Sequence, residues 1–358
     1  MDAHRTSSHA EYLKWGAGGG GETGGARPEY DGDLLAEYHA ARHGVALADL
    51  SHQGALLVSG PDRTPFLQNL ISNDLNLLTE TQGIYSALLS AKGRVIADFF
   101  IYSQPDAYLI ELEWVPAQTL LTHLLRYRFR SKVTFSTPPW GKLLLAGPRA
   151  GALLAAFLGV PPPTAAARSC FQPPPLPLAI RRAIACESDA LLYLPEARLP
   201  EVWDRLLTLG ATDGVRPIGQ TTLETLRIEA GRPRHGADMD DQTLAIEAGL
   251  SAAISLSKGC YPGQEVMARI DTYGHVNRHL RGLYLAGGGV PGQGASVFHE
   301  EEEVGRVTSV AESPTLGPIA LAYLRTPVAE PGTAVVVHSA HTRWNAKVSA
   351  LPFALPTP

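Results

Sequence analysis

Eight consecutive residues bring a thiol, a phenol, an amide, a carboxylate and an ammonium group together on a stretch rich in turn formers. They are Lys258, Gly259, Cys260, Tyr261, Pro262, Gly263, Gln264 and Glu265, and Arg269 follows one helical turn later. The two glycines and the proline favour a tight, specifically shaped turn. Polar side chains this dense on a rigid loop indicate a functional site.

Cys260 is the candidate for chemistry in this octapeptide. Most single cysteines in soluble proteins are small hydrophobic residues, so a structural interpretation stands beside the functional one. A neighbouring cation would favour the thiolate, and Lys258 and Arg269 are both candidates to supply it. The chain has three cysteines and no CxxC pair, so we expect neither dithiol redox chemistry nor a zinc knuckle.

Asp98 is a second candidate, because its neighbours predict a buried strand over residues 94–103. With a period of two, Asp98 shares one face of this strand with Ile96 and Phe100. A carboxylate among apolar side chains costs free energy unless it is paired or used. Two interpretations remain: an acid satisfied by hydrogen bonds or by water at an edge, and a functional group.

Glu229 is a third candidate, in the last turn of a helix that we expect to open with a Thr221–Glu224 capping box and to end at Gly231. An acid there faces the negative end of the helix dipole. Arg227 and Arg232 could offset this cost, so an ordinary ion pair is one interpretation and a binding role is the other.

The elements that must position these residues divide the chain into several parts. With 358 residues, it is long enough for two or three domains. Residues 1–32 are expected to be a flexible glycine-rich tail. Both helical and strand-like segments are expected between residues 33 and 278. Short strands separated by Gly/Pro turns follow over residues 279–358 and predict a small antiparallel barrel.

Charge and composition exclude some classes of function. The net charge of −5 and the pI near 6.2 argue against a general nucleic-acid binder. Arg126, Arg128, Arg130 and Lys132 do cluster, but whether they share a face depends on the local structure. His275 and His279 stand four residues apart without a third ligand nearby, so no metal site is expected.

Targeting signals are not evident either. No apolar run reaches the length of a membrane span. The N-terminal region carries Asp2, Glu11 and Glu22 without an apolar segment, unlike a secretory signal or an acid-poor transit peptide. We therefore expect a cytoplasmic protein.

The string K-G-C-Y-P-G-Q-E with its following arginine resembles the signature of the YgfZ family, folate-binding proteins linked to iron–sulfur cluster assembly. That family shares its fold with the glycine-cleavage T-protein aminomethyltransferases. The stretches ADLSHQGALLVSGPDRTPFLQNLISND and RYRFRSKVTF extend the resemblance, which runs from about Leu34 to the end. It implies an α+β, GcvT-like fold in which two α+β lobes and a C-terminal antiparallel β-barrel surround a central folate-binding channel. The parts would be a folate-binding lobe over 33–140 that shares strands with the next, a lobe over 141–278 with the octapeptide, and a barrel over 279–358.

The resemblance also assigns residues. It places Asp98 at the folate as an essential group for one-carbon transfer, and Glu229, in the element LRIEAG, on the pterin ring. The other candidates for folate binding are Tyr85, Arg227, Lys258 and Arg269. Cys260 would be a reactive thiol on a loop whose remaining motif residues are Gly259, Tyr261, Gly263, Gln264 and Glu265.

The function implied is that of a tetrahydrofolate-binding accessory factor for iron–sulfur cluster assembly or repair, with clients that include tRNA-modifying radical enzymes. The ligand would be tetrahydrofolate or a one-carbon derivative. Partners would be iron–sulfur client or assembly proteins, with neither direct nucleic-acid binding nor a membrane. The alternative is an aminomethyltransferase that moves a one-carbon unit to tetrahydrofolate, a reaction that does not require Cys260. A module that has lost folate is a third class, and catalytic turnover is left open.

Overall fold

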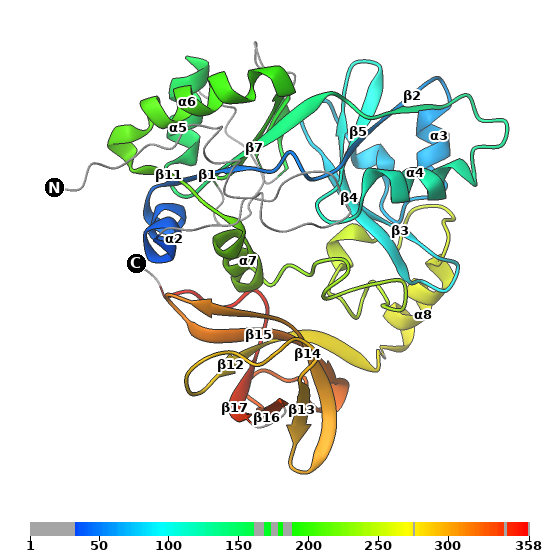
Figure 1. Ribbon diagram of the computed structural model, residues 1–358. Helices are drawn as coiled ribbons and strands as arrows, with labels where there is room; N and C mark the ends of the chain where they lie inside the picture. The colour runs from blue at the N-terminus through cyan, green and yellow to red at the C-terminus, as the bar shows by residue number, and fades with distance from the viewer. Residues whose placement is uncertain are drawn as a thin grey trace.

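The computed structural model describes residues 33–160, 168–172, 178–181, 188–274, 276–339 and 342–356. The tail expected over residues 1–32 lies outside these residues, as does His275 of the histidine pair. Two α+β lobes lie side by side above a β-barrel, and helix α7 lies between them and the barrel (Figure 1). The expected class, an α+β GcvT-like fold with a C-terminal antiparallel barrel, is confirmed.

One lobe is built on a six-stranded sheet in the order β11–β1–β7–β10–β9–β8. Its strands are β1 (Val45–Asp49), β7 (Trp140–Ala146), β8 (Cys170–Phe171), β9 (Leu178–Arg181), β10 (Ala190–Pro195) and β11 (Val215–Pro217). Helices α5 (Ala150–Leu158) and α6 (Leu199–Leu209) cover one face, and α2 (Leu34–His43) and α7 (Gln220–Glu229) pack on the other. Strand β1 is buried on both faces, and its first four residues are all apolar.

The other lobe is built on a five-stranded antiparallel sheet in the order β3–β4–β5–β2–β6. Its strands are β2 (Ala55–Ser59), β3 (Ile84–Leu89), β4 (Val95–Ser103), β5 (Ala107–Glu111) and β6 (Thr134–Ser136). Helices α3 (Arg63–Gln68) and α4 (Ala117–Leu125) cover one face. On β4 the odd-numbered residues 95–101 are buried, whereas Ile96, Asp98 and Phe100 on the other face are only partly buried.

The C-terminal part is a closed six-stranded barrel in the order β12–β15–β14–β13–β16–β17. Its strands are β12 (Arg278–Leu285), β13 (Ser296–His299), β14 (Glu302–Ser313), β15 (Gly317–Arg325), β16 (Ala334–Ser339) and β17 (Thr342–Ser349). Alternate residues fill its interior, as a period of two requires. Ile228 of α7 packs on Ile319 and Leu321 of β15, which joins the barrel to the lobes.

The start of α7 differs from the expected capping box. The helix begins at Gln220 after the N-cap Gly219, and Thr221 makes no capping bond. Instead Glu37 of α2 accepts hydrogen bonds from the Gly219 amide at 3.0 Å and from Thr222 Oγ1 at 2.6 Å. A neighbouring helix therefore satisfies the N-terminus of α7, a contact between residues too far apart in the chain for a local pattern to reveal.

None of the helices in the described parts of the chain is long and apolar enough to span a membrane.

Candidate functional site

Asp98 and Tyr85 meet on the partly buried face of the five-stranded sheet. Strands β3 and β4 pair so that Tyr85 lies opposite Phe100 and Ala87 opposite Asp98. The Tyr85 hydroxyl donates a hydrogen bond of 2.7 Å to Asp98 Oδ2. The Tyr85 and Phe100 rings are stacked, with centroids 4.6 Å apart. The sheet therefore presents a carboxylate, a phenol and two aromatic faces together.

The electrostatic surroundings raise the pKa of this carboxyl group towards neutral pH. Burial raises the pKa of Asp98 to about 6, although the Tyr85 hydrogen bond acts in the opposite direction. The nearby Glu113 carboxylate raises this pKa further and the Arg232 guanidinium lowers it. Burial and the Asp98 charge hold the pKa of Tyr85 well above its ordinary value, so Tyr85 stays a donor. Such a carboxylate can accept or return a proton near neutral pH.

The segment that follows α7 lies alongside this face. The Val95 amide donates to the Thr243 carbonyl at 3.0 Å, and Tyr85 packs in one cluster with Leu244 and Ile246. Sequence reasoning missed the ion pair between Arg232 and Glu113, whose charges act on Asp98. These two residues are 119 positions apart, and no sequence signal joins them. Phe100 could have been found, since it shares the period-two face of Asp98.

Glu229 lies in a different environment. Its carboxylate is buried, and Oε1 accepts a hydrogen bond of 2.8 Å from the Tyr38 hydroxyl. Ser313 Oγ also donates to Oε1, and Arg42 forms an ion pair with Oε2. The group thus ties α7 to α2 and β14. Three donors contact the two carboxylate oxygens, which offer about four lone-pair positions, so the expected pterin contact stays a prediction.

Arg227 is likewise used inside the fold. Its five N–H donors are all engaged: Nε and Nη2 bind Glu224, Nη1 binds Asp238 and the Arg232 carbonyl, and Nη2 also binds Ser309. The side chain is buried beside the barrel. The expected role in folate binding disagrees with these contacts, because no N–H of the guanidinium is left for a ligand.

The octapeptide forms a loop against the turn between β3 and β4. Gly263 has a φ of +84°, and a Cβ there would stand 2.7 Å from the Ser90 carbonyl oxygen, so glycine is required. The Tyr261 hydroxyl donates to the Ser255 carbonyl at 3.2 Å, and Gln264 Nε2 donates to the Lys258 carbonyl at 3.1 Å. Helix α8 (Gln264–Tyr273) continues from the loop. Hydrogen bonds within the loop and close packing against the β3–β4 turn therefore fix the backbone of the octapeptide.

Lys258 anchors this loop to the end of α3. Its buried ammonium donates to the carbonyls of Gln68 at 2.6 Å, Ile71 at 2.7 Å and Asn73 at 3.0 Å. Burial lowers the pKa of Lys258 to about 8, so the ammonium form predominates at pH 7. All three donors are used by the backbone, which differs from the expected contact with folate or with the thiol.

Cys260 is exposed at the surface of the loop. Arg269 and Glu265 are also exposed, on α8. Asp98 lies on β4, four residues beyond Arg94 at the end of the β3–β4 turn. At the rise of an extended strand, these two residues are about 13 Å apart. The structure therefore places the thiol on the loop beside the β3–β4 turn and the carboxylate farther along the sheet.

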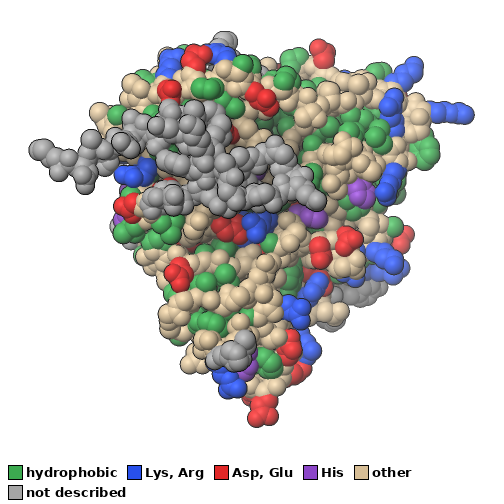
Figure 2. All heavy atoms as spheres, viewed as in Figure 1, with side chains coloured by type: hydrophobic (Ala, Val, Ile, Leu, Met, Phe, Trp, Pro, Cys, Tyr) green, Lys and Arg blue, Asp and Glu red, His purple; other side chains and the backbone are tan. Residues whose placement is uncertain are grey.

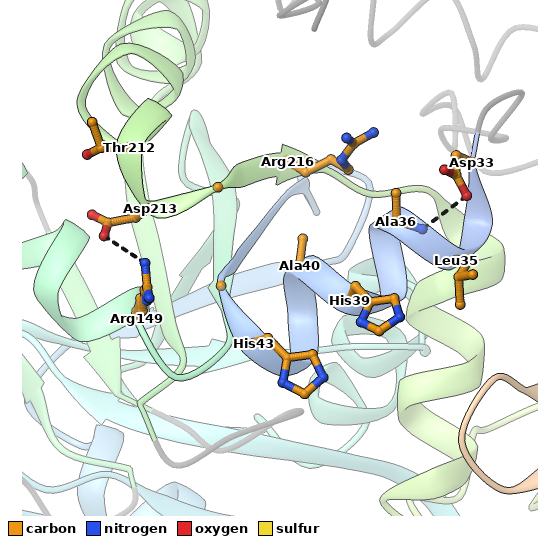
Figure 3. A pocket seen from close by; sticks show the side chains of 12 residues that line it. Asp33, Leu35, Ala36, His39, Ala40, His43, Arg149, Thr212, Asp213 and Arg216 are labelled. Carbon is orange, nitrogen blue, oxygen red and sulfur yellow. Dashed lines mark hydrogen bonds and ion pairs between the residues drawn. The ribbon is translucent and has the colours of Figure 1, made fainter. Parts of the chain in front are cut away.

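A separate hollow of about 600 Å³ lies on the outer side of α2. His39 and His43 project from this helix one turn apart, and Arg149 forms an ion pair with Asp213 nearby (Figure 3). Tyr38 and Arg42 of the same helix bind Glu229 instead. None of the residues expected to act from the sequence lines this hollow.

The buried contacts that Glu229 makes with α2 and β14 are expected to stabilise the fold. Glu229→Gln should lower the free energy of unfolding by about 3 kcal/mol, because it leaves the Arg42 charge without its buried partner. Urea denaturation measures this loss, and Glu265→Gln, at an exposed acid, is the matched control. Tetrahydrofolate affinity should stay within about twofold of the wild type. Unchanged stability with lost folate affinity would instead support the pterin contact of Glu229.

Comparison with known proteins places this geometry in a family. Residues 9–258 match the family described as GCVT N-terminal domain, and residues 278–354 match the glycine cleavage T-protein C-terminal barrel domain. The chain belongs to the glycine cleavage T-protein family. These matches do not distinguish the YgfZ family, whose signature the octapeptide resembles, from the other members.

Relatives in this family are similar over nearly the whole chain. The aminomethyltransferase of Shouchella clausii is 32% identical, with 88% of this chain and 88% of that protein covered. That of Desulforamulus reducens is 29% identical, with 91% and 90% covered. The crystal structure of glycine cleavage system aminomethyltransferase T from Bartonella henselae superposes with a TM-score of 0.86 at 26% identity, covering 95% of each chain.

Proposed function

We propose that the chain binds tetrahydrofolate against the Asp98–Tyr85–Phe100 face and transfers an aminomethyl one-carbon unit to it. One observation carries the proposal: a carboxylate with a pKa of about 6, hydrogen-bonded to a phenol, stands beside a stacked aromatic pair. The name aminomethyltransferase, shared by the relatives described above, supports this choice of reaction over the iron–sulfur role.

The residues on this face fit such a substrate. A reduced folate has flat ring systems, which aromatic side chains contact over a large area. It also carries N–H groups, for which the Asp98 carboxylate is an acceptor. The partly buried setting strengthens hydrogen bonds relative to water. Ring contact and charge complementarity therefore coincide at one place in the sheet.

The chemistry assigned to Asp98 is proton transfer. Methylenetetrahydrofolate forms when two amine nitrogens of tetrahydrofolate bond to the carbon of the aminomethyl donor and each loses a proton. The bonds from that carbon to the lipoyl sulfur and to the amino nitrogen break, and the two protons end on the lipoyl thiol and on ammonia. Asp98 accepts one of these protons as a general base and can return it to the departing group. Tyr85 acts as a positioning residue, because its hydroxyl fixes one oxygen of the carboxylate.

Ammonia release tests this reaction. The purified protein, incubated with tetrahydrofolate and an aminomethyl-loaded lipoyl carrier protein, should release one ammonia for each methylenetetrahydrofolate formed. Omitting tetrahydrofolate is the control. An absence of ammonia, together with saturable folate binding, would overturn the transfer reaction while leaving the folate site in place.

A second candidate function rests on Cys260. This thiol is exposed on a loop pinned by Lys258 and Gln264, within a string that resembles the YgfZ signature. In this account the chain is a tetrahydrofolate-binding factor for iron–sulfur cluster assembly or repair, and the thiol acts on a client protein. Cys170 is unsuited to that task, because burial raises the pKa of its thiol to about 11.

Cys260→Ser separates the two candidates. The variant should fold and bind tetrahydrofolate like the wild type, because the thiol is exposed and the loop keeps its hydrogen bonds. It should also retain aminomethyl transfer. If the second function operates, the wild type should complement a strain deficient in iron–sulfur cluster repair and Cys260→Ser should not. Ser257→Ala, at an exposed residue of the same segment, is the matched control, and full complementation by Cys260→Ser would reject a role for the thiol.

A further inference from the structure

The loop that follows α4 gathers basic and aromatic side chains on the surface of the five-stranded lobe. We call residues 126–132 the arginine–aromatic loop; its members are Arg126, Tyr127, Arg128, Phe129, Arg130, Ser131 and Lys132. In Figure 1 this loop projects at the right-hand edge of the view, and Figure 2 shows Lys and Arg side chains beside hydrophobic ones there. The cluster noted in the sequence is thus brought together on one projection.

The cations of this loop are not used inside the fold. Arg126, Arg128, Arg130 and Lys132 are all exposed. Their side chains make no hydrogen bond or ion pair with any other residue in the described part of the chain. Four positive charges within seven residues form a local positive patch, although the whole chain has a net charge of −5. At physiological salt the screening length is about 8 Å, so a bound ligand responds to the patch more than to the distant charges.

The aromatic side chains point outward as well. Phe129 is 87% exposed and Tyr127 is 43% exposed. Phe129 has a φ of +35°, a conformation that bulky side chains rarely adopt. Both rings border a shallow hollow of about 740 Å³, together with Asp62 and Arg130. Backbone positions of this kind concentrate at functional sites.

The base of the loop is held in place. Asp62 Oδ2 accepts a hydrogen bond of 2.7 Å from the Lys132 amide, and the Ser131 amide donates to the Arg128 carbonyl at 2.7 Å. At Gly60 a Cβ would stand 2.2 Å from the Lys132 carbonyl oxygen, so the chain approaches there as closely as glycine allows. The outward rings and guanidinium groups are therefore presented by a fixed turn, which limits the entropy that binding would cost.

From this arrangement we infer a binding site for a single-stranded polynucleotide, RNA or DNA, at the arginine–aromatic loop. Aromatic and guanidinium planes stack on bases, and cations contact the phosphates between them. An anionic lipid surface would also attract these cations, so vesicles of an anionic lipid are the competing ligand in the test. An acidic protein would use the four charges but would not require two exposed rings between them. The inference goes beyond the proposed folate chemistry and differs from the expectation, drawn from net charge, of no direct nucleic-acid binding.

Fluorescence anisotropy with the full chain tests the site. The probes are fluorescein-labelled oligouridylate and oligothymidylate of twenty nucleotides, in 50 mM salt. Four phosphate contacts predict a slope of log affinity against log salt of about −2.8, or a loss of about 50-fold between 50 and 200 mM. Phe129→Ser should weaken binding at least about fivefold through lost stacking. The triple variant Arg126→Gln, Arg128→Gln, Arg130→Gln should flatten the salt slope to about −0.7.

A matched variant at exposed cations of the barrel, Arg306→Gln, Arg343→Gln, Lys347→Gln, should bind like the wild type. Circular dichroism should show the same folded spectrum for all variants, since every changed side chain is exposed. Binding to neither oligonucleotide would overturn the inference. It would also be overturned if the wild type bound phosphatidylglycerol vesicles or poly-glutamate at least as tightly as the oligonucleotides. Equal losses in the barrel and loop variants would show non-specific charge attraction and reject the site.

Discussion

Asp98→Asn should reduce aminomethyl transfer to tetrahydrofolate by about 10²–10⁴-fold, because the amide has no basic oxygen to accept the proton. In the wild type, kcat/KM should rise tenfold per pH unit below pH 6 and level off above it, since burial raises the pKa of Asp98 to about 6. The pH profile of ammonia release measures both effects. Tyr85→Phe, which keeps the ring but frees the carboxylate, should cause a smaller loss.

Asp98→Asn should be more stable than the wild type at neutral pH. Asp98 has a folded pKa of about 6, against about 4 in the unfolded chain. Because the folded state holds the proton more tightly, the contribution of this group is most favourable below pH 4 and is lost as pH rises to about 6. Above that, its ionisation costs up to about 3 kcal/mol. Urea unfolding should show this gain for Asp98→Asn at pH 7.5 but not at pH 4, and a loss at pH 7.5 would contradict it.

Lys258→Met should have the largest effect on stability. The change leaves the carbonyls of Gln68, Ile71 and Asn73 without the buried ammonium that now binds all three. Unsatisfied buried carbonyls cost about 1–3 kcal/mol each, and water can reach some of them, so we expect a loss of about 3–5 kcal/mol. Urea denaturation at pH 7, where the lysine is charged, measures the difference.

The neighbouring turn offers a control for this prediction. Lys92→Met changes an exposed lysine and should alter stability by no more than about 0.5 kcal/mol. Wild-type stability in Lys258→Met would mean that the loop is held by Gly263 packing and the Tyr261 and Gln264 hydrogen bonds alone.

Much of the fold could be predicted from local patterns. The barrel strands and the β3–β4 hairpin follow a period of two with turn residues between them, and both are present. Helix α8 is absent from the prediction, although Gly263 and Gly274 adopt positive φ at its two ends. The pairing of β1 with β7 and β11 in the six-stranded sheet depends on contacts with residues about 100 to 170 positions away. Local patterns hold no information on such contacts.

In the candidate site, too, local sequence patterns identify some residues but not their distant partners. Asp98 stands out from the sequence because a carboxylate interrupts an apolar face, and the structure pairs it with Tyr85. Glu229 stands out for a similar reason, yet its partners Tyr38 and Arg42 lie 191 and 187 residues away. Lys258 looks like part of a reactive loop until its three carbonyl partners are seen. The residue type shows that a buried polar group needs hydrogen-bond partners, but only the fold determines which residues those partners are.

Titration calorimetry with tetrahydrofolate, using the full chain under anaerobic conditions at pH 7.5, measures whether the Asp98–Tyr85–Phe100 face binds folate. We predict saturable binding of one tetrahydrofolate per chain in the wild type. Phe100→Ala should weaken this binding by about tenfold, because it removes one of the stacked rings, and Leu256→Ala, at an exposed apolar residue on another segment, should not change it. Wild-type protein that binds no tetrahydrofolate, or equal affinity in the Phe100 variant, would contradict a folate site on this face of the sheet.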